Sequence, residues 1–524
     1  MQKLVGSFWT TLEKDQSQIS PEERHQALCT AEGLLTSWPE IDKPTRETVL
    51  QNLEHHSLHS CAFNHLLIDS IRYHLTKDLT FLKTIPARID EHPDDLAACA
   101  STFMTLAEMV FNDTGNTLAA IINRRVFRTL FEKQHSHIGG LYDRLVGNRF
   151  QPFSPNNKVV ILTRQFLQSP HAPTVDTINF ATLLTQDYGK EVMIVASSEY
   201  THGNDGAIVP AACGAMIPEY QGGLKTIDAN GHSFPFLMCG DGVFSENAAI
   251  QGMQTIDAFS PEMILCISAP SLLAEPFHHR CFCFIYPTAR GVPLTKHCFF
   301  HTWDQPDAEM QHILDQENLR GKHLFAQHPG FEVKPPSTAL TRRQFGIPED
   351  AFLFVVVGIR LFMDIDDRFL QLLIQICDHP KAHIAFAGNF ENYKEQVGKH
   401  AALKGRTTHL GFQQDIMGVY QIADAYLNPI RNGGGSAIVY ALQAGLPVLS
   451  LPSGDAGMVV AGFPPLETYE DMGKRAYDLM TNAMVLGDYQ KLAHQEAPKF
   501  SGRKSLLHNI MQAFNEFAKR QGQH

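Results

Sequence analysis

The sequence predicts an α/β protein in which two open, mostly parallel sheets follow an all-helical N-terminal region. Apolar residues recur at helical spacing up to about residue 150. From residue 158 onward, short apolar runs alternate with helical stretches. Such runs are typical of parallel strands, which are buried on both faces. A chain of 524 residues is long enough for two or three domains.

The N-terminal region begins with a clear helix signal. Ser20 is a typical N-cap, and Pro21 stands at the first helical position, where its missing N–H leaves no bond unmade. A later helix is expected to break at Gly139-Gly140. We expect residues 1–150 to form one all-helical domain. Further helices are expected at 46–57, 63–75, 94–110 and 116–144.

Two α/β domains are expected next, at 155–315 and 320–500, with a C-terminal helix at 501–524. Open α/β domains bind ligands at the carboxyl ends of their strands, so this is where a site is expected. The helix at 174–184 lies between the first two strands and completes a strand–helix–strand unit. The strands are expected at 159–163, 191–196, 263–267, 281–285 and 297–301, then at 352–358, 383–388, 409–411, 425–428 and 448–451.

Composition excludes several classes of protein. A formal charge of −12 and a pI near 6.1 argue against a nucleic-acid binder. No apolar run reaches about 18 residues, so no membrane span is expected. The N-terminus lacks the apolar core and cleavage site of a signal peptide. The ten cysteines are scattered and mostly stand in apolar contexts. We therefore expect a cytoplasmic protein with reduced thiols.

One group of residues invites a zinc hypothesis. Cys281 and Cys283 stand near His278, His279 and His297. Two cysteines in a Cys-x-Cys strand share one face, but the sequence supplies no second pair at the spacing of a structural zinc site. We therefore expect no metal site in this protein.

A glycine loop is the most informative motif. Residues 433–435 are three glycines, and Ser436 is a good N-cap for a helix expected at 437–444. Gly445 suits a left-handed residue after the helix, and Pro447 prevents its continuation. A helix N-terminus behind glycines offers N–H groups and a positive dipole end to a diphosphate. An ordinary loop–helix–strand joint of an α/β domain has the same pattern.

The C-terminal half resembles glycosyltransferases of the GT-B class, which have two facing Rossmann-like domains. The resemblance covers roughly residues 320–490. Within the class, the segment from Phe345 to Phe352 looks like the O-GlcNAc transferase group. The bacterial cytoplasmic transferases that glucosylate adhesins on asparagine are similar in carrying an all-helical domain ahead of the catalytic core. The matched elements are Val357 to Arg360, Ala385 to Gly388, Leu410 to Phe412, Ala425 to Pro429 and Gly433 to Pro452.

The resemblance implies a diphosphate cradle made by backbone N–H groups at the start of the helix. The cradle residues would be Gly433, Gly434, Gly435, Ser436 and Ala437.

The resemblance also implies roles for side chains. Arg360 would neutralise the leaving diphosphate. Phe412 and Gln413 would line the base pocket, with backbone groups reading the uracil edge. Asn389 would contact the nucleotide or the sugar. His171 would face the transferred sugar or the acceptor, and an unperturbed pKa would let it serve as a general base near neutral pH.

Two positions depart from the family pattern. Tyr440 stands where many retaining members carry a Glu that contacts the ribose, and Asp364 stands where a Lys is common. A carboxylate beside a diphosphate is unfavourable unless it points away. Either another basic residue, Lys334 or Arg431, supplies the charge, or the donor site is altered. Asp364-Ile-Asp366 has a metal-binding spacing, but it is expected to open a helix.

The function expected is transfer of a hexose or N-acetylhexosamine from a UDP-sugar to a protein or glycan acceptor. No metal and no cofactor besides the donor is expected. The helical domain would hold the acceptor, or act as a structural cap, a homo-oligomer contact or a partner-binding surface. Two alternatives remain open: a capsule or glycan polysaccharide transferase, and a catalytically inactive GT-B protein that binds a partner.

Overall fold

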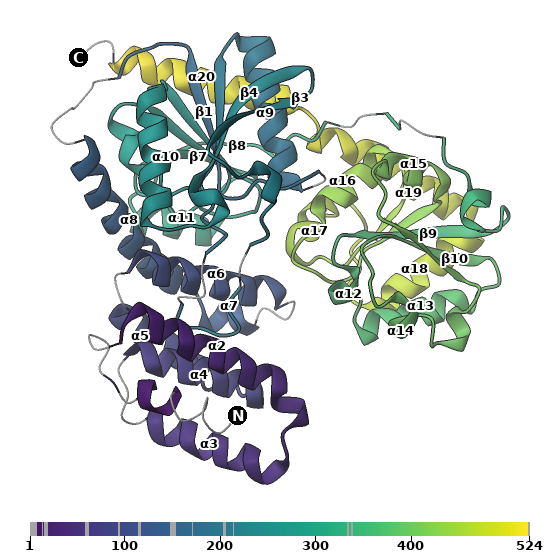
Figure 1. Cartoon of the computed structure of the whole chain (residues 1–524). Coiled ribbons are helices and arrows are strands. Elements are labelled where there is room, and N and C mark those ends of the chain that lie inside the picture. The colour runs from purple at the N-terminus through teal and green to yellow at the C-terminus, as the bar shows by residue number, and fades with distance from the viewer. Residues whose placement is uncertain are drawn as a thin grey trace. The chain divides into compact units, whose positions relative to one another are not determined.

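The computed structural model divides into two compact units, Met1–Gln327 with Asn509–His524, and His328–His508 (Figure 1). Each unit is described by itself. The residues described are 8–12, 14, 19–57, 62–92, 95–113, 117–146, 153–169, 171–202, 206–212, 214–332, 335–336 and 339–521.

The first unit begins with the helical region. A capping box fixes the start of the first long helix: Ser20 Oγ accepts from the Glu23 N–H, and the Glu23 carboxylate accepts from the Ser20 N–H. This confirms the predicted N-cap. The helices are α2 (Pro21–Ser37), α3 (Lys43–Ser57), α4 (Ala62–Thr76), α5 (Ile85–Arg88), α6 (Leu96–Asn112), α7 (Thr117–Ile121) and α8 (Arg124–Val146).

The predicted break at Gly139-Gly140 was wrong. Helix α8 runs through both glycines, and the chain interrupts instead between α7 and α8. Ile138 and Leu141 flank the glycines and are buried in the core of the first unit, so tertiary packing outweighs the low helix propensity of glycine.

The first sheet has the strand order β3-β4-β2-β1-β5-β6-β7-β8, and every neighbouring pair is parallel except β3 and β4. The five predicted strands are present, whereas β3, β4 and β8 were not predicted. The strands are β1 (Lys158–Thr163), β2 (Glu191–Ala196), β3 (Leu224–Ala229), β4 (His232–Met238), β5 (Met263–Ser268), β6 (Phe282–Pro287), β7 (Phe299–Thr302) and β8 (His323–Ala326).

Four helices accompany this sheet, and the last of them comes from the end of the chain (Figure 1). Phe517 of that helix contacts Phe282 of β6 and Phe299 of β7, with ring centroids 5.4 and 6.0 Å apart. The C-terminal segment therefore completes the first unit. The helices are α9 (Ala172–Tyr188), α10 (Glu246–Phe259), α11 (Ala308–Gln316) and α20 (Arg503–Gln521), of which α20 belongs to this unit from Asn509 onward.

The helical region and the first sheet belong to one unit because a loop between β2 and β3 bonds to the helices. The segment 206–212 enters the helical region, and Ala207, Ile208 and Val209 are buried in its core. Its backbone N–H groups donate to helical side chains: Ala207 to Thr102 Oγ1 at 3.0 Å, Val209 to Ser70 Oγ at 3.1 Å, Ala211 to Glu32 Oε1 at 3.0 Å and Ala212 to Thr105 Oγ1 at 3.0 Å.

The second unit is a five-stranded, all-parallel sheet in the order β11-β10-β9-β12-β13. The order reverses between β9 and β12, which is the point where open α/β sheets bind their ligands. The strands are β9 (Phe352–Gly358), β10 (Ala382–Gly388), β11 (Thr407–Gly411), β12 (Ala425–Leu427) and β13 (Val448–Leu449), and all five were predicted. The helices are α12 (Leu361–Asp364), α13 (Asp367–Cys377), α14 (Tyr393–Gln396), α15 (Ile416–Ile422), α16 (Gly435–Gln443), α17 (Gly454–Val459), α18 (Tyr469–Thr481) and α19 (Ala483–Glu496).

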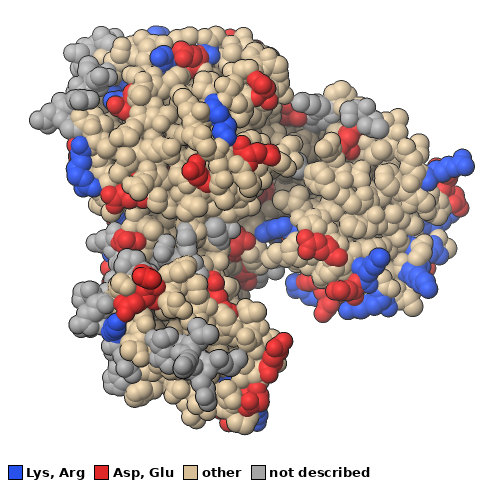
Figure 2. All heavy atoms as spheres, viewed as in Figure 1, with Lys and Arg blue, Asp and Glu red and all other residues tan. Residues whose placement is uncertain are grey.

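The surface carries no large basic field on the face drawn in Figure 2, where Lys and Arg lie intermixed with Asp and Glu in each unit. This agrees with the formal charge of −12. Over the described residues, none of the helices combines the length and the hydrophobicity that a bilayer crossing requires.

Candidate functional site

The candidate site lies in the second unit, at the carboxyl ends of β9 and β12. These strands are parallel neighbours, with Val355 opposite Tyr426. The chain leaves β9 through Arg360 into α12, and it leaves β12 through the glycine loop into α16. The two loops therefore meet at the same edge of the sheet, beside the point where the strand order reverses.

A buried arginine ties these loops together. Arg431 Nη1 lies 3.0 Å from Asp364 Oδ2, and the two side chains are 6% and 9% exposed. Its Nη2 donates to Val357 O at 2.8 Å, to Tyr426 Oη at 3.0 Å and to Asn428 Oδ1 at 2.8 Å. Nearby acceptors outweigh burial and raise the pKa of Arg431, which stays charged. The positive charge of Arg431, on the glycine loop, thus offsets the negative charge of the Asp364 carboxylate.

One glycine of the loop and one at the end of β9 are needed because they pack against this guanidinium. Gly434 has a φ of +90°, and a Cβ there would lie 2.7 Å from Cζ of Arg431. A Cβ on Gly358 at the end of β9 would lie 2.6 Å from Arg431 Nη1. Because such contacts are too short, any side chain at these positions would displace the arginine or the loop.

Helix α16 begins earlier than the sequence predicted. Gly434, in the left-handed conformation, is the N-cap, so the prediction that Ser436 caps the helix was wrong. Ser436 and Ala437 lie in the first turn, where the N–H groups have no partner inside the helix. No side chain caps this N-terminus in the described part of the chain. Gly445 has a φ of +76°, which confirms the predicted left-handed residue at the far end.

The structure places the remaining predicted residues of this unit around the same edge. Arg360 directly precedes α12 and is half-buried. Asn389 follows β10, is exposed, and donates to Glu391 Oε1 at 3.1 Å. Phe412 follows β11 with its side chain 50% exposed, and the side-chain amide of the next residue, Gln413, donates to Leu410 O.

The last two predicted residues of this unit, Gly433 and Tyr440, lie at or on helix α16. Gly433 stands in the loop immediately before the N-cap of α16. Tyr440, on the second turn of α16, packs edge-on against Phe331, with ring centroids 6.0 Å apart. This aromatic contact gives Tyr440 a packing partner at the position where the resembled family carries a Glu.

His171 belongs to the first unit and has a different environment from the one expected. It precedes α9, and its Nδ1 lies 2.8 Å from Thr174 Oγ1. Burial lowers the pKa of His171 to about 4, so the expectation of an unperturbed pKa was wrong. The imidazole is neutral at pH 7, and the neutral form can still donate or accept a hydrogen bond.

Sequence reasoning named Arg431 only as one of two charges that could face a diphosphate, and it missed the pairing with Asp364. The alternative, Lys334, lies outside the described residues. For Asp455 the sequence favoured a turn role over a sugar-ligand role. This residue lies on the first turn of α17, with its Cβ 3.0 Å from where a Cβ on Gly435 would stand, and burial raises its pKa to about 6.

Comparison with known protein families finds a match in the region of the candidate site. Residues 337–462 match the model of the family "Glycosyl transferases group 1". The matched segment contains β9 to α17, and therefore the glycine loop, Arg360, Arg431 and Asp364. The match confirms the prediction of a glycosyltransferase. Together with the two α/β sheets and the helical region, it confirms the predicted GT-B fold class. The adhesin-glucosylating group stays a prediction.

Solved structures were also compared. An O-GlcNAc transferase from Thermobaculum terrenum is 12% identical, with 100% of this chain and 99% of that chain covered and a TM-score of 0.46. Alr3699/HepE from Anabaena, in complex with UDP, is 14% identical over 68% of this chain and 100% of its own, with a TM-score of 0.49. WaaG, a glycosyltransferase involved in lipopolysaccharide biosynthesis, is 12% identical over 65% and 95%, with a TM-score of 0.45. No curated protein sequence matched the chain.

Proposed function

We propose that the chain transfers a hexose or an N-acetylhexosamine from a UDP-sugar to a protein acceptor. The observation that carries the proposal is the start of α16, where Gly434 lies against the guanidinium of the buried Arg431–Asp364 pair at the carboxyl end of the sheet. The first-turn N–H groups and the helix dipole form a site for a diphosphate. The family match over the same residues supports a role for that diphosphate as leaving group.

In this proposal the protein stabilises the charge that develops as the nucleotide diphosphate departs. Backbone N–H groups of Gly435, Ser436 and Ala437 donate to its oxygens, and Arg360 adds a charge-assisted donor from the end of β9. The half-exposed ring of Phe412 lines the base pocket. The side-chain amide of Gln413 is bonded to its own loop, so its backbone groups are the ones left to read the uracil edge.

The proposed transfer uses no metal ion at the donor site. Of the two carboxylates in Asp364-Ile-Asp366, the first is bonded to Arg431 at 3.0 Å. The second caps α13, where Asp366 Oδ1 accepts from the Phe369 N–H at 2.8 Å. Both carboxylates therefore have roles in holding the protein together. Because the charge of Asp364 is offset, its presence no longer favours an inactive protein.

We assign the acceptor to the helical region, which contains a groove of about 630 Å³. The groove is bounded by α4, α6, α7 and the segment 210–212. Tyr73 offers an aromatic face, and Lys77, Glu108 and Asn112 offer polar groups along it. A mixed aromatic and polar lining suits a polypeptide, whose backbone needs hydrogen bonds and whose side chains bury apolar area.

The proposal is tested by titrating the full chain with UDP, GDP and their sugars while recording the melting temperature. A ligand that binds only the folded state raises this temperature in a saturable way. We expect stabilisation by uracil nucleotides alone, followed by labelling of a peptide acceptor detected by mass spectrometry. Stabilisation by guanine nucleotides alone would contradict the donor class. Transfer to a glycan but to no polypeptide would contradict the acceptor class.

A further inference from the structure

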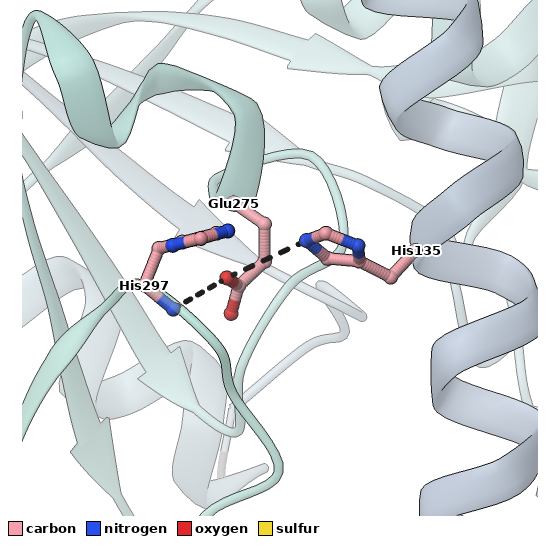
Figure 3. A group of neighbouring side chains, drawn as sticks. All are labelled: His135, Glu275 and His297. Carbon is pink, nitrogen blue, oxygen red and sulfur yellow. Dashed lines mark hydrogen bonds and ion pairs between the residues drawn. The ribbon is translucent and has the colours of Figure 1, made fainter. Parts of the chain in front are cut away.

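A second group of chemically active side chains lies in the first unit, outside the candidate donor site. His135 comes from α8, Glu275 from the short 3-10 helix Glu275–His279, and His297 from the loop before β7 (Figure 3). One ligand atom from each of the three lies within 4.8 Å of the others. The two imidazoles approach the carboxylate from opposite sides (Figure 3). Residues far apart in the sequence therefore converge on one point.

The carboxylate at the centre of the group is held rigidly. Glu275 is fully buried, and burial raises its pKa. Its Oε1 accepts from the Thr295 hydroxyl. Its Oε2 accepts from the backbone N–H of His297 at 2.9 Å and from the backbone N–H of Lys296 at 3.3 Å. His135 Nε2 lies 4.0 Å from the same Oε2. Hydrogen bonds of this kind orient the ligating groups of metal sites.

The imidazoles are also constrained. The ring of His278 stacks on that of His297, with centroids 3.7 Å apart and planes 5° apart, and His278 Nδ1 lies 2.8 Å from Glu275 O. The rings of His135 and His297 lie with their centroids 5.5 Å apart, so both imidazoles border the same small space.

We propose that His135, Glu275 and His297 bind one divalent transition-metal ion of the zinc class. Two imidazoles and one carboxylate are a known donor set for zinc, with a fourth position for water. Tetrahedral zinc with bonds of about 2.0–2.2 Å holds its ligand atoms roughly 3.4 Å apart. The 4.0 Å between His135 Nε2 and Glu275 Oε2, and the spacing of up to 4.8 Å among the three ligand atoms, would have to shorten when an ion binds.

Cys281 and Cys283 stand apart from this group, whereas the thiol of Cys298, next to His297, hydrogen-bonds to the Glu275 carboxylate. The thiol of Cys281 donates to Pro261 O at 3.0 Å, and that of Cys283 donates to Ala274 O at 3.4 Å, so both point into the core. The nearby positive charge of Arg128 is offset by Glu317, whose Oε2 lies 2.9 Å from Arg128 Nη1. The proposed donor set is the three residues named above, and Lys296 and Lys322 add positive charge near the imidazoles.

The proposed ion links two parts of the first unit. It joins α8 of the helical region to the first sheet, next to the ion pairs that Arg124 and Arg128 make with Glu317. It is separate from the donor site of the second unit, so its loss should leave uridine-nucleotide binding unchanged.

The test uses the full, tag-free chain. The protein is stripped with EDTA, and Zn²⁺ or Co²⁺ is then added while bound metal is counted by elemental mass spectrometry and the melting temperature is recorded. We expect one ion per chain, a higher melting temperature on rebinding, and the visible absorption of tetrahedral Co²⁺. Recovery of no stoichiometric metal, with a melting temperature unaffected by EDTA and by Zn²⁺, would overturn the proposal.

Variants locate the ion. His135→Ala and, separately, His297→Gln should each weaken binding more than about 100-fold, because loss of a supporting residue alone costs 10–100-fold. The matched control is His137→Ala on the same helix, whose Nε2 lies 3.1 Å from Glu246 Oε2 and which should bind metal normally. Equal metal affinity in the wild type and in folded His135→Ala and His297→Gln would place the ion elsewhere and refute the assignment.

Discussion

Arg431 and Asp364, 67 positions apart in the chain, form a buried ion pair between the glycine loop and the end of α12. The pair joins the end of β9 to the end of β12, and the guanidinium also bonds Val357 O, Tyr426 and Asn428. The glycine loop packs on this guanidinium. The shape of the candidate diphosphate site therefore depends on an interaction that does not itself need to touch the ligand.

Removing one partner of this pair should destabilise the second unit. Arg431→Met would leave the Asp364 carboxylate buried without its counter-charge, and breaking a buried pair costs about 3–5 kcal/mol. Urea denaturation should show this loss. Lys474, which forms an exposed pair with Glu470, is the control, and Lys474→Ala should leave stability unchanged. Equal stability of Arg431→Met and the wild type would show that the ion pair makes no net contribution to the free energy of unfolding.

Gly434→Ala should weaken binding of the nucleotide sugar. A left-handed alanine costs about 1–2 kcal/mol, and its Cβ also meets the Arg431 guanidinium, so the loop has to move. Gly405→Ala is the matched control, since Gly405 has a φ of +73° and open space where a Cβ would stand. Calorimetry should show weaker UDP binding in the first variant only. Similar losses in both would indicate backbone strain rather than the loop.

Arg360→Ala should reduce turnover by about 10²–10³-fold, the usual cost of losing one donor to developing charge. Donor binding should fall less, because the charge grows only as the bond to the sugar breaks. Arg368→Ala is the control, since Arg368 is an exposed arginine on α13. Initial rates and UDP affinity should be measured for both variants. Unchanged turnover in Arg360→Ala would remove Arg360 from the catalytic machinery.

The pH dependence of donor binding should report on Asp455. Burial raises the pKa of Asp455 to about 6, so this carboxyl is neutral below pH 6 and charged above it. A negative charge beside Gly435 opposes a diphosphate. Affinity for a UDP-hexose should therefore fall between pH 5 and pH 7, and Asp455→Asn should remove this fall. A parallel pH dependence in the variant would assign the titration to another group.

The acceptor groove is tested with Tyr73→Ala. We expect the acceptor KM to rise about tenfold, which corresponds to about 1.4 kcal/mol of lost contact. The affinity for the donor should not change. Phe111→Ala provides the control, since Phe111 is a 40% exposed aromatic residue on α6 that does not line the groove. A rise in KM in both variants would point to a general effect on the helical region.

Strands β9, β10, β12 and β13 of the second sheet could be predicted because each is a short apolar run, whereas β11, Thr-Thr-His-Leu-Gly, is mostly polar. The hairpin of the first sheet was missed for a different reason. Its strands β3 and β4 meet at Asn230-Gly231, a turn pair typical of hairpins, but β3 is largely exposed and shows no apolar run. The turn signal is present in the sequence, but a search for apolar runs alone does not detect this hairpin.

The candidate site could be predicted only where it is local. The glycine loop and α16 are continuous in the sequence, so their positions followed from residue types. The pairing of Arg431 with Asp364 depends on two loops meeting at one edge of the sheet, which no local pattern specifies. The low pKa of His171 depends likewise on burial, which a single residue in a loop does not reveal.

The segment 206–212 has a consequence for engineering. It donates four backbone hydrogen bonds to helical side chains and fills part of their core. The helical region is therefore a discontinuous module, and a graft that moves only the N-terminal helices would leave behind a piece of their interior. A chimera intended to change the acceptor should transplant both stretches together.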